Sequence, residues 1–305
     1  MFHPMSAIGS KPAWALVAGA SLWGIVWYPY RLLAQAGLDG IWATALTYGL
    51  ALLLGTAIFF RHVASLRHAP MLAALMGLAI GWSNLAYVLA VLEGEVMRVL
   101  LLFYLAPLWT VPIAWVLLEE KIDRASGVAM GLALAGAITM LWRPELGFPW
   151  PESRAEWLAV VAGFLFALGN VLVRRIDKMT DAGKSIVIWM GVTIAALAHM
   201  PWSRVRAEYA FELAWGHWTL VGGVAAALVA MSLAMQYGLS RIPANRAIVL
   251  LLIELPIAAV AAWLLSGEVP RLQDYLGGAL IVAATLTSAF MDGARTKGTD
   301  PLAPG

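Results

Sequence analysis

The sequence predicts an all-α membrane protein whose ten transmembrane helices form two inverted five-helix repeats. Composition is the first observation behind this prediction. Of the 305 residues, 62% are hydrophobic and 12% are charged, whereas soluble domains average about 45–50% apolar and about 25% charged residues. The second observation is that the apolar runs are continuous and reach the roughly 20 residues that a helix needs to cross a bilayer. Continuous runs favour helices over the alternating strands of a barrel.

The third observation is an internal repeat. The segment RVLLLFYLAPLWTVPIAWVLLEE, residues 98–120, reappears at one constant offset as RAIVLLLIELPIAAVAAWLLSGE, residues 246–268. A second offset pairs Trp14 with Trp157 and continues for more than a helix length. Self-similarity at fixed spacing indicates one structural unit used twice, and two related halves are common in secondary transporters.

Each expected helix is a continuous apolar run. Most of these runs are separated by short connections, which are typical of antiparallel neighbours, and tryptophans mark many of their ends at headgroup depth. In chain order, we expect spans near 13–34, 40–60, 71–92, 96–118, 124–142, 154–175, 184–202, 217–239, 244–265 and 272–291.

One connection differs from the others. Residues 143–153, RPELGFPWPES, contain three prolines, which cannot extend a helix. This linker separates a first repeat at 13–142 from a second at 154–291, and residues 292–305 form a polar tail that we expect to be disordered. Because five is an odd number, the second repeat enters the membrane facing the other way, so the repeat is inverted.

The distribution of Lys and Arg predicts the orientation. Loops on the side of the N-terminus hold thirteen of these residues and loops on the other side hold seven, so both termini are expected in the cytoplasm. We expect a multi-pass protein of the bacterial inner membrane. A competing interpretation is that Lys11 and AWALVAGAS belong to a signal peptide. The apolar run continues to Tyr28, however, and has a repeat partner around Trp157, which favours a first span.

Polar residues within the spans are candidates for a binding cavity. Asn84 lies beside Ser83 and three residues before Tyr87, so Asn84 and Tyr87 share a helix face. The eighth span has Ser232 four residues before Gln236, and the sixth has Asn170, which maps by the repeat onto Trp27. Such groups either line one cavity or make interhelical hydrogen bonds worth about 0.6 kcal/mol each. Both possibilities stay open.

Aromatic residues add to this set. Trp23 and Trp27 on the first span and Trp82 on the third lie within the apolar runs and close to polar neighbours. Flat rings offer a stacking surface, and aromatic pairs contribute about 0.5–1.5 kcal/mol beyond their buried area. They also attract cations such as an ammonium group.

Glu254 lies well inside the ninth span, where a carboxylate costs roughly 2.5–3.5 kcal/mol. We expect it to bind a substrate ammonium group or a proton, or else to pair with an arginine near a helix end. Pro107 and Pro256, in the fourth and ninth spans, each remove a backbone hydrogen bond and kink the helix. They are candidate hinges for alternating access, or static bends.

Several classes of function are excluded. The chain contains no cysteine, so thiol catalysis and thiolate metal sites are impossible. It has no phosphate-binding loop, no HExxH motif and no serine elbow. We therefore expect no enzyme, no catalytic residue, no metal and no cofactor. The net charge of +2 without a dense basic cluster argues against nucleic acid. The expected partners are a small-molecule substrate and membrane lipid, and two fused halves can enclose a cavity as a monomer.

Two long segments carry a family resemblance. APLWTVPIAWVLLEEKIDRASGVAMGLALAGAITML and ELPIAAVAAWLLSGEVPRLQDYLGGALIVAATL resemble the EamA-type exporter domain of the drug/metabolite transporter superfamily, present twice. With FYLAP beside an aromatic-rich third span, the chain looks most like the YddG-type aromatic amino-acid exporters. The resemblance implies efflux of aromatic and other neutral amino acids through a central cavity. By that analogy, the lining includes Tyr104, Trp82, Ser83, Asn84 and Phe166. The chain departs from the pattern in having Ala106 just before Pro107, where a bulky aromatic residue is expected.

These observations favour a secondary transporter of the inner membrane that exports small metabolites, aromatic and other neutral amino acids among them, by alternating access. One alternative is an exporter of cationic or drug-like compounds that uses Glu254 as the charge partner. Another, from a different class, is a non-transporting membrane scaffold or a lipid scramblase.

Overall fold

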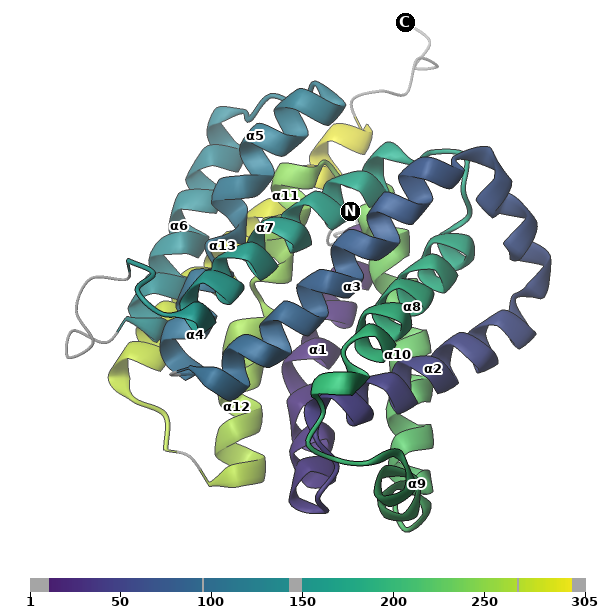
Figure 1. Ribbon diagram of the computed structural model, residues 1–305. Helices are drawn as coiled ribbons and strands as arrows, with labels where there is room; N and C mark the ends of the chain where they lie inside the picture. Colours follow the sequence, from purple (N-terminus) through teal and green to yellow (C-terminus); the bar gives the residue numbers. More distant parts are fainter. Residues whose placement is uncertain (1–10, 95, 143–149, 268, 298–305) are drawn as a thin grey trace, which may run out of the picture.

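The computed structural model describes residues 11–94, 96–142, 150–267 and 269–297, and this part of the chain contains helices and turns but no strand (Figure 1). In chain order, the helices are α1 (Lys11–Gln35), α2 (Gly40–Ile58), η1 (Phe60–His68), α3 (Pro70–Glu93), α4 (Val96–Phe103), α5 (Ala106–Leu118), α6 (Arg124–Leu141), α7 (Arg154–Arg175), α8 (Asp181–Ala198), η3 (Met200–Trp202), α9 (Ala207–Trp215), α10 (Trp218–Leu239), α11 (Ala244–Leu251), α12 (Glu254–Ser266) and α13 (Leu272–Lys297).

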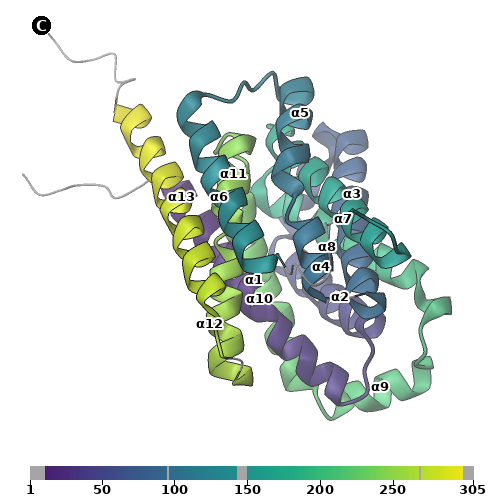
Figure 2. The same ribbon diagram turned by 90° about the vertical axis from the view of Figure 1, so that its left-hand side faces the viewer.

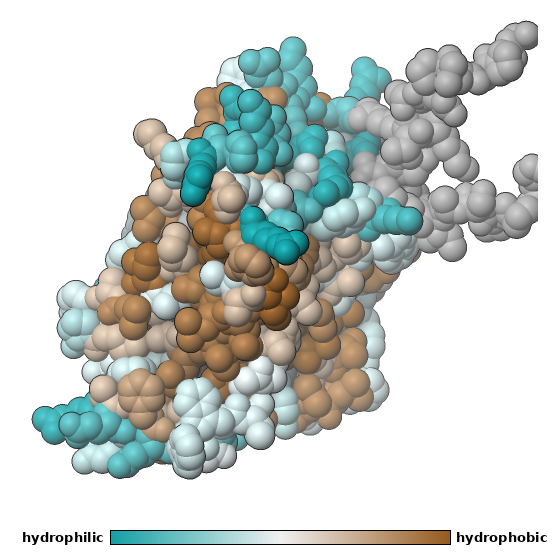
Figure 3. Space-filling view, turned by 90° about the vertical axis from the view of Figure 1, so that its right-hand side faces the viewer, coloured by the Kyte–Doolittle hydropathy of each residue, from teal (hydrophilic) through white to brown (hydrophobic). Residues whose placement is uncertain are grey.

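Within the described ranges, eight helical stretches are long and apolar enough to cross a membrane, and α4–α5 and α11–α12 each count as one of them. Helices α1 and α13 occupy the first and tenth predicted spans. Trp, Tyr and Pro residues in the second half of α1 reduce its hydropathy. Figure 3 shows hydrophobic side chains in a band across the middle of one face, with hydrophilic ones toward its two ends. This distribution fits a membrane-spanning bundle.

Several helices begin directly after a residue whose side chain caps the helix N-terminus. Asp39 caps α2 by accepting from the Trp42 backbone N–H at 2.9 Å, and Asp123 caps α6 through Ser126 at 2.7 Å. Ser153 and Thr180 cap α7 and α8 in the same way. Each such bond satisfies an N–H that has no partner inside the helix. Helix α13 continues to Lys297, six residues past the predicted end of the tenth span.

The predicted spans pack in a definite pattern. Helix α3 lies along α7 and α8, α10 lies along α1 and α2, and α6 lies along α13. Helix α5 packs on α7, and α12 packs on α1. Figure 2 shows α6, α12 and α13 together on one side of the bundle, with α9 at the end opposite to the α5–α6 connection. Most of the predicted linker, residues 143–149, lies outside the described residues.

Two of the spans are interrupted. The fourth stops at Phe103 and resumes at Ala106, and the ninth stops at Leu251 and resumes at Glu254. Pro107 lies at the start of α5, where a missing N–H is tolerated, and Pro256 lies in the first turn of α12. Each interruption therefore lies within four residues before a proline that was predicted to kink its helix. The hinge role of Pro107 and Pro256 stays a prediction.

Glycines set the closest helix contacts. A Cβ at Gly77 of α3 would lie 2.9 Å from the Val187 carbonyl oxygen of α8, so these two helices make close contact at this glycine. Two glycines of α6 make no such contact, because a Cβ at Gly127 or Gly131 would meet no atom within 4 Å. The contact on α6 is made instead by Gly136, whose Cβ would lie 2.6 Å from the Gly277 carbonyl oxygen of α13.

This difference gives opposite expectations for two alanine substitutions. Gly136→Ala should lower the free energy of unfolding by about 1–3 kcal/mol, because the new methyl group meets a backbone oxygen that cannot move aside. Gly127→Ala should raise it by about 0.4–1 kcal/mol, because the site is open and alanine restricts the unfolded chain. Thermal unfolding in detergent, followed by tryptophan fluorescence, would measure both. Equal shifts in the two variants would contradict this account of the packing.

Candidate functional site

Four aromatic rings form a cluster at the first helix break. Tyr87 of α3 lies 5.0 Å from Phe103 at the end of α4, and Phe103 lies 5.2 Å from Tyr104 and 5.4 Å from Phe166 of α7, between ring centroids. These distances and the tilted or edge-on angles are those of favourable aromatic pairs. We call these four residues the aromatic cluster. Tyr87, Tyr104 and Phe166 belong to the predicted site, and Phe103, beside Tyr104 in FYLAP, is an addition.

Glu254 brings the second helix break to the same place. It is the first residue of α12, half-buried, and its carboxylate accepts a hydrogen bond from the Tyr104 hydroxyl. Tyr87 lies close enough to interact with it electrostatically. A carboxylate is stabilised at a helix N-terminus by the unpaired N–H groups there. Among the described residues, the hydrogen-bond partner of Glu254 is thus a tyrosine rather than the arginine considered as an alternative.

Two of the predicted polar residues make interhelical bonds. Ser83 donates to the Ala162 carbonyl oxygen at 2.8 Å and joins α3 to α7. Ser232 accepts from Trp189 Nε1 at 3.0 Å and joins α10 to α8, with both side chains buried. The bonding capacity of both hydroxyls is therefore used, at least in part, by helix packing in this conformation.

Asn170 and Gln236 differ from these hydroxyls. They are only 7% and 4% exposed, and the Asn170 Nδ2 and Gln236 Oε1 atoms have no hydrogen-bond partner in the described part of the chain. Buried polar atoms are nearly always paired with protein, water or ligand. These two amides therefore retain capacity for a further partner.

Four predicted residues remain, and none of them is part of the aromatic cluster: Trp23, Trp27, Trp82 and Asn84. Trp82 is 40% exposed and packs edge-on against His199 at 5.0 Å. Trp23 is partly buried against the main core, and Trp27 packs edge-on against Tyr28. Asn84 is half-buried on α3. Of the predicted residues, the structure thus brings together Tyr87, Tyr104, Phe166 and Glu254, and it places Trp82 at the periphery.

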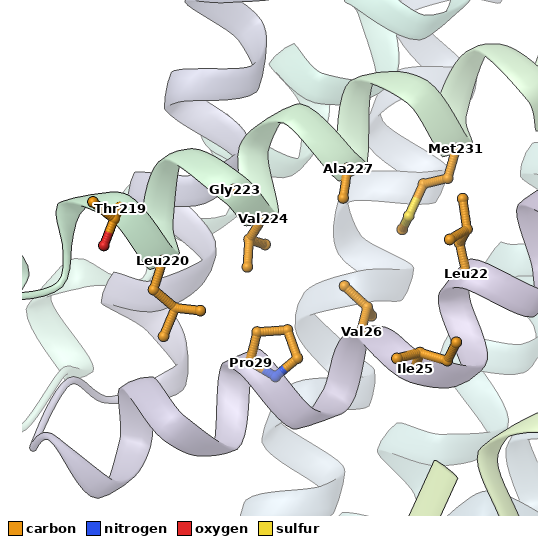
Figure 4. A pocket seen from close by; sticks show the side chains of 10 residues that line it. All are labelled: Leu22, Ile25, Val26, Pro29, Thr219, Leu220, Gly223, Val224, Ala227 and Met231. Carbon is orange, nitrogen blue, oxygen red and sulfur yellow. The ribbon is translucent and has the colours of Figure 1, made fainter. Parts of the chain in front are cut away.

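A separate cavity lies between α1 and α10 (Figure 4). Its volume is about 240 Å³. It is lined by Leu22, Ile25, Val26, Pro29, Thr219, Leu220, Gly223, Val224, Ala227 and Met231. None of the twelve predicted binding residues is among them, and the lining is almost entirely hydrocarbon, so it suits an apolar group only. In the described ranges, no group of three or more His, Asp or Glu side chains could hold a metal ion.

Comparison with known proteins agrees with this architecture. The model of the EamA-like transporter family matches residues 10–142 and 153–290. An uncharacterized transporter of Archaeoglobus fulgidus is 28% identical over 215 residues, 70% of this chain and 74% of the relative. A riboflavin transporter of Vibrio cholerae is 26% identical over 235 residues, 73% of this chain and 70% of the relative. One crystal structure shares the fold with a TM-score of 0.72 at 18% identity, covering 93% of this chain and 99% of that one.

The hydrogen-bonded Ser232 hydroxyl and the unpaired Gln236 amide oxygen should differ in their contribution to the free energy of unfolding. Ser232→Ala should lower the free energy of unfolding by about 1–3 kcal/mol, because the buried Trp189 N–H loses its acceptor. Gln236→Met has nearly the same shape and should cost less, because it removes an oxygen without a partner. Unfolding midpoints of the two variants in one detergent would decide. A larger loss in Gln236→Met would show that this amide has a structural role.

Proposed function

The chain belongs to the EamA-like transporter family, and we propose that it exports small organic molecules that carry an amino group on a flat or apolar body, aromatic and other neutral amino acids above all. The observation that carries this proposal is the Glu254 carboxylate bonded to Tyr104 at the edge of the aromatic cluster. Ring faces stack on a flat body and attract an ammonium group. A carboxylate inside a membrane protein is a functional site by default.

We further propose that the transporter works by alternating access between two inverted repeats, residues 13–142 and 154–291. The packing supports this proposal because the main contacts between helices of the two halves come in corresponding pairs. Helix α3 lies on α7 and α8 as α10 lies on α1 and α2, and α5 lies on α7 as α12 lies on α1. Each half also has one broken helix, and broken helices line the sites of many secondary transporters.

A second candidate is export of cationic or drug-like compounds, because one carboxylate among aromatic rings also suits a cation without an acid group. An amino acid brings its own carboxylate, which needs a donor. The unpaired amide of Asn170, one turn from Phe166 on α7, offers one and favours the amino acid. The name of the Vibrio cholerae relative adds riboflavin, a flat molecule, to the substrates worth testing.

Purified protein in liposomes can separate these candidates. Saturable counterflow of labelled phenylalanine and threonine should be seen with the unmodified chain. Glu254→Gln should reduce phenylalanine transport at least about tenfold, because loss of one charge contact to an ammonium group corresponds to roughly 1.4 kcal/mol or more. Tyr104→Phe keeps the ring, removes the hydroxyl and should have a smaller effect. Glu119→Gln, at an exposed position outside the cluster, is the matched control.

The substrate panel decides between the classes. Transport of phenyltrimethylammonium with none of phenylalanine would favour the cation exporter. Riboflavin transport that survives Glu254→Gln would point to a neutral flat substrate. If no compound shows saturable movement, the scaffold or scramblase alternative gains, and lipid movement in the same liposomes would tell those two apart.

A further inference from the structure

A polar network joins the two halves at one end of the bundle, where α5, α7 and α10 end and α8 and α11 begin. Its centre is Glu120, just past the end of α5. Oε1 of Glu120 accepts from Arg174 Nε at 3.3 Å, and Oε2 accepts from the Ala244 backbone N–H at 2.8 Å. One carboxylate of the first half thus holds the end of α7 and the start of α11, both in the second half.

Two cations extend the network. Arg174 Nη1 donates to the Ser240 carbonyl oxygen at 2.9 Å, and Lys184 Nζ donates to Ser240 Oγ at 2.8 Å and to the Val173 carbonyl oxygen at 2.7 Å. Lys184 is only 1% exposed, so its charge is held by these bonds. We call Glu120, Arg174, Lys184, Ser240 and Ala244 the Glu120 network.

A second bridge lies beside the first. Arg246 of α11, 3% exposed, donates to Ser126 Oγ of α6 at 3.3 Å, and its Nη2 lies 3.9 Å from Asp123 Oδ2. Both bridges therefore hold α11, the first part of a broken helix. The other end of α11 leads to the break before Glu254, so the network and the aromatic cluster are at opposite ends of the same element.

Asn170 and Gln236 each lie one helical turn from this network along their own helices, α7 and α10. Val173 follows Asn170 by three residues on α7, and Ser240 follows Gln236 by four at the end of α10, so each amide is one helical turn from an atom bonded to Lys184 Nζ. Phe166 lies one turn further from the network on α7. The order along the bundle is the Glu120 network, the two unpaired amides and then the aromatic cluster.

We propose that the Glu120 network is a gate that closes this end of the transport path over a polar vestibule formed by Asn170 and Gln236. When the bonds of Glu120 break, α11 and the end of α7 are released, and the vestibule becomes accessible to water and to the polar head group of a substrate. This inference rests on the proposed transport function for its purpose. Its test measures accessibility without substrate, so the two can fail separately.

The absence of cysteine makes the test direct. Asn170→Cys and Gln236→Cys each introduce a single thiol into the full chain. Each is placed in lipid nanodiscs, where both ends of the bundle meet a membrane-impermeant maleimide. With Glu120 intact, labelling should be slow. Glu120→Gln should accelerate it at least tenfold, whereas Glu119→Gln, which removes the neighbouring exposed carboxylate, should leave the rate unchanged.

Two further thiols control for general loosening. Lys178→Cys, exposed at the same end, should label fast in every background, and Leu228→Cys, buried in α10, should stay unreactive. If Leu228→Cys becomes reactive in the Glu120→Gln background, that variant has loosened the whole bundle. The labelling rates are then measured in the Arg174→Gln background, which removes the ion pair and keeps the Glu120–Ala244 bond. Faster labelling of Asn170→Cys and Gln236→Cys in the Arg174→Gln background, with Leu228→Cys still unreactive, supports the gate. Equal rates in the Glu120→Gln and Glu119→Gln backgrounds, or no acceleration in Arg174→Gln, would overturn it.

Discussion

The rest of the structure depends on how two interrupted helices satisfy their backbone groups inside an apolar bundle. In lipid, every N–H and C=O needs a partner, and irregular backbone persists only where protein or a cavity covers it. At the first break, Leu108 N–H bonds to Leu105 O at 2.9 Å; at the second, Leu252 and Ile253 bond to carbonyls three residues back at 3.2 and 3.3 Å. These tight turns are protected by neighbouring helices. They place Tyr104 and Glu254 within bonding distance of each other.

Glycine on the neighbouring helices makes this protection possible. A Cβ at Gly163 of α7 would lie 2.7 Å from the Phe103 carbonyl oxygen, and one at Gly24 of α1 would lie 2.7 Å from that of Glu254. Without side chains at these positions, α7 and α1 press directly on the two breaks. Since lipid tails are as apolar as leucine, such close contact between backbones drives helix association in membranes more than hydrophobicity does. The approach at Gly163 also brings Phe166, one turn along, to the ring of Phe103.

Sequence reasoning located the helices and the breaks because continuous apolar runs and prolines act locally. Tyr87 and Glu254 stand out in the sequence as polar groups inside predicted spans, whereas Tyr104 and Phe166 enter the predicted lining through the family resemblance. Sequence reasoning could not tell which face of a helix meets which neighbour. Trp82 and Ser83 are adjacent in sequence, yet one packs against His199 at the periphery and the other bonds α7.

Long-range bonds were likewise out of reach. Lys184 is the first residue of the predicted seventh span, where a loop cation exposed to solvent is expected, but it is buried in α8 and bonded to α7 and to the end of α10. No spacing rule connects Glu120 to Ala244, 124 positions away.

The chemistry of the site lies in the differences between the two repeats. At the constant offset that relates the two segments, Phe103, Tyr104 and Ala106 correspond to Leu251, Leu252 and Glu254. One copy therefore contributes rings and no charge at its break, and the other contributes a charge and no ring. A substrate that bridged the breaks would meet an apolar aromatic surface on one side and a carboxylate on the other. Duplication supplies two matching breaks, and divergence at three positions gives the space between them a polarity that can orient an amphipathic molecule.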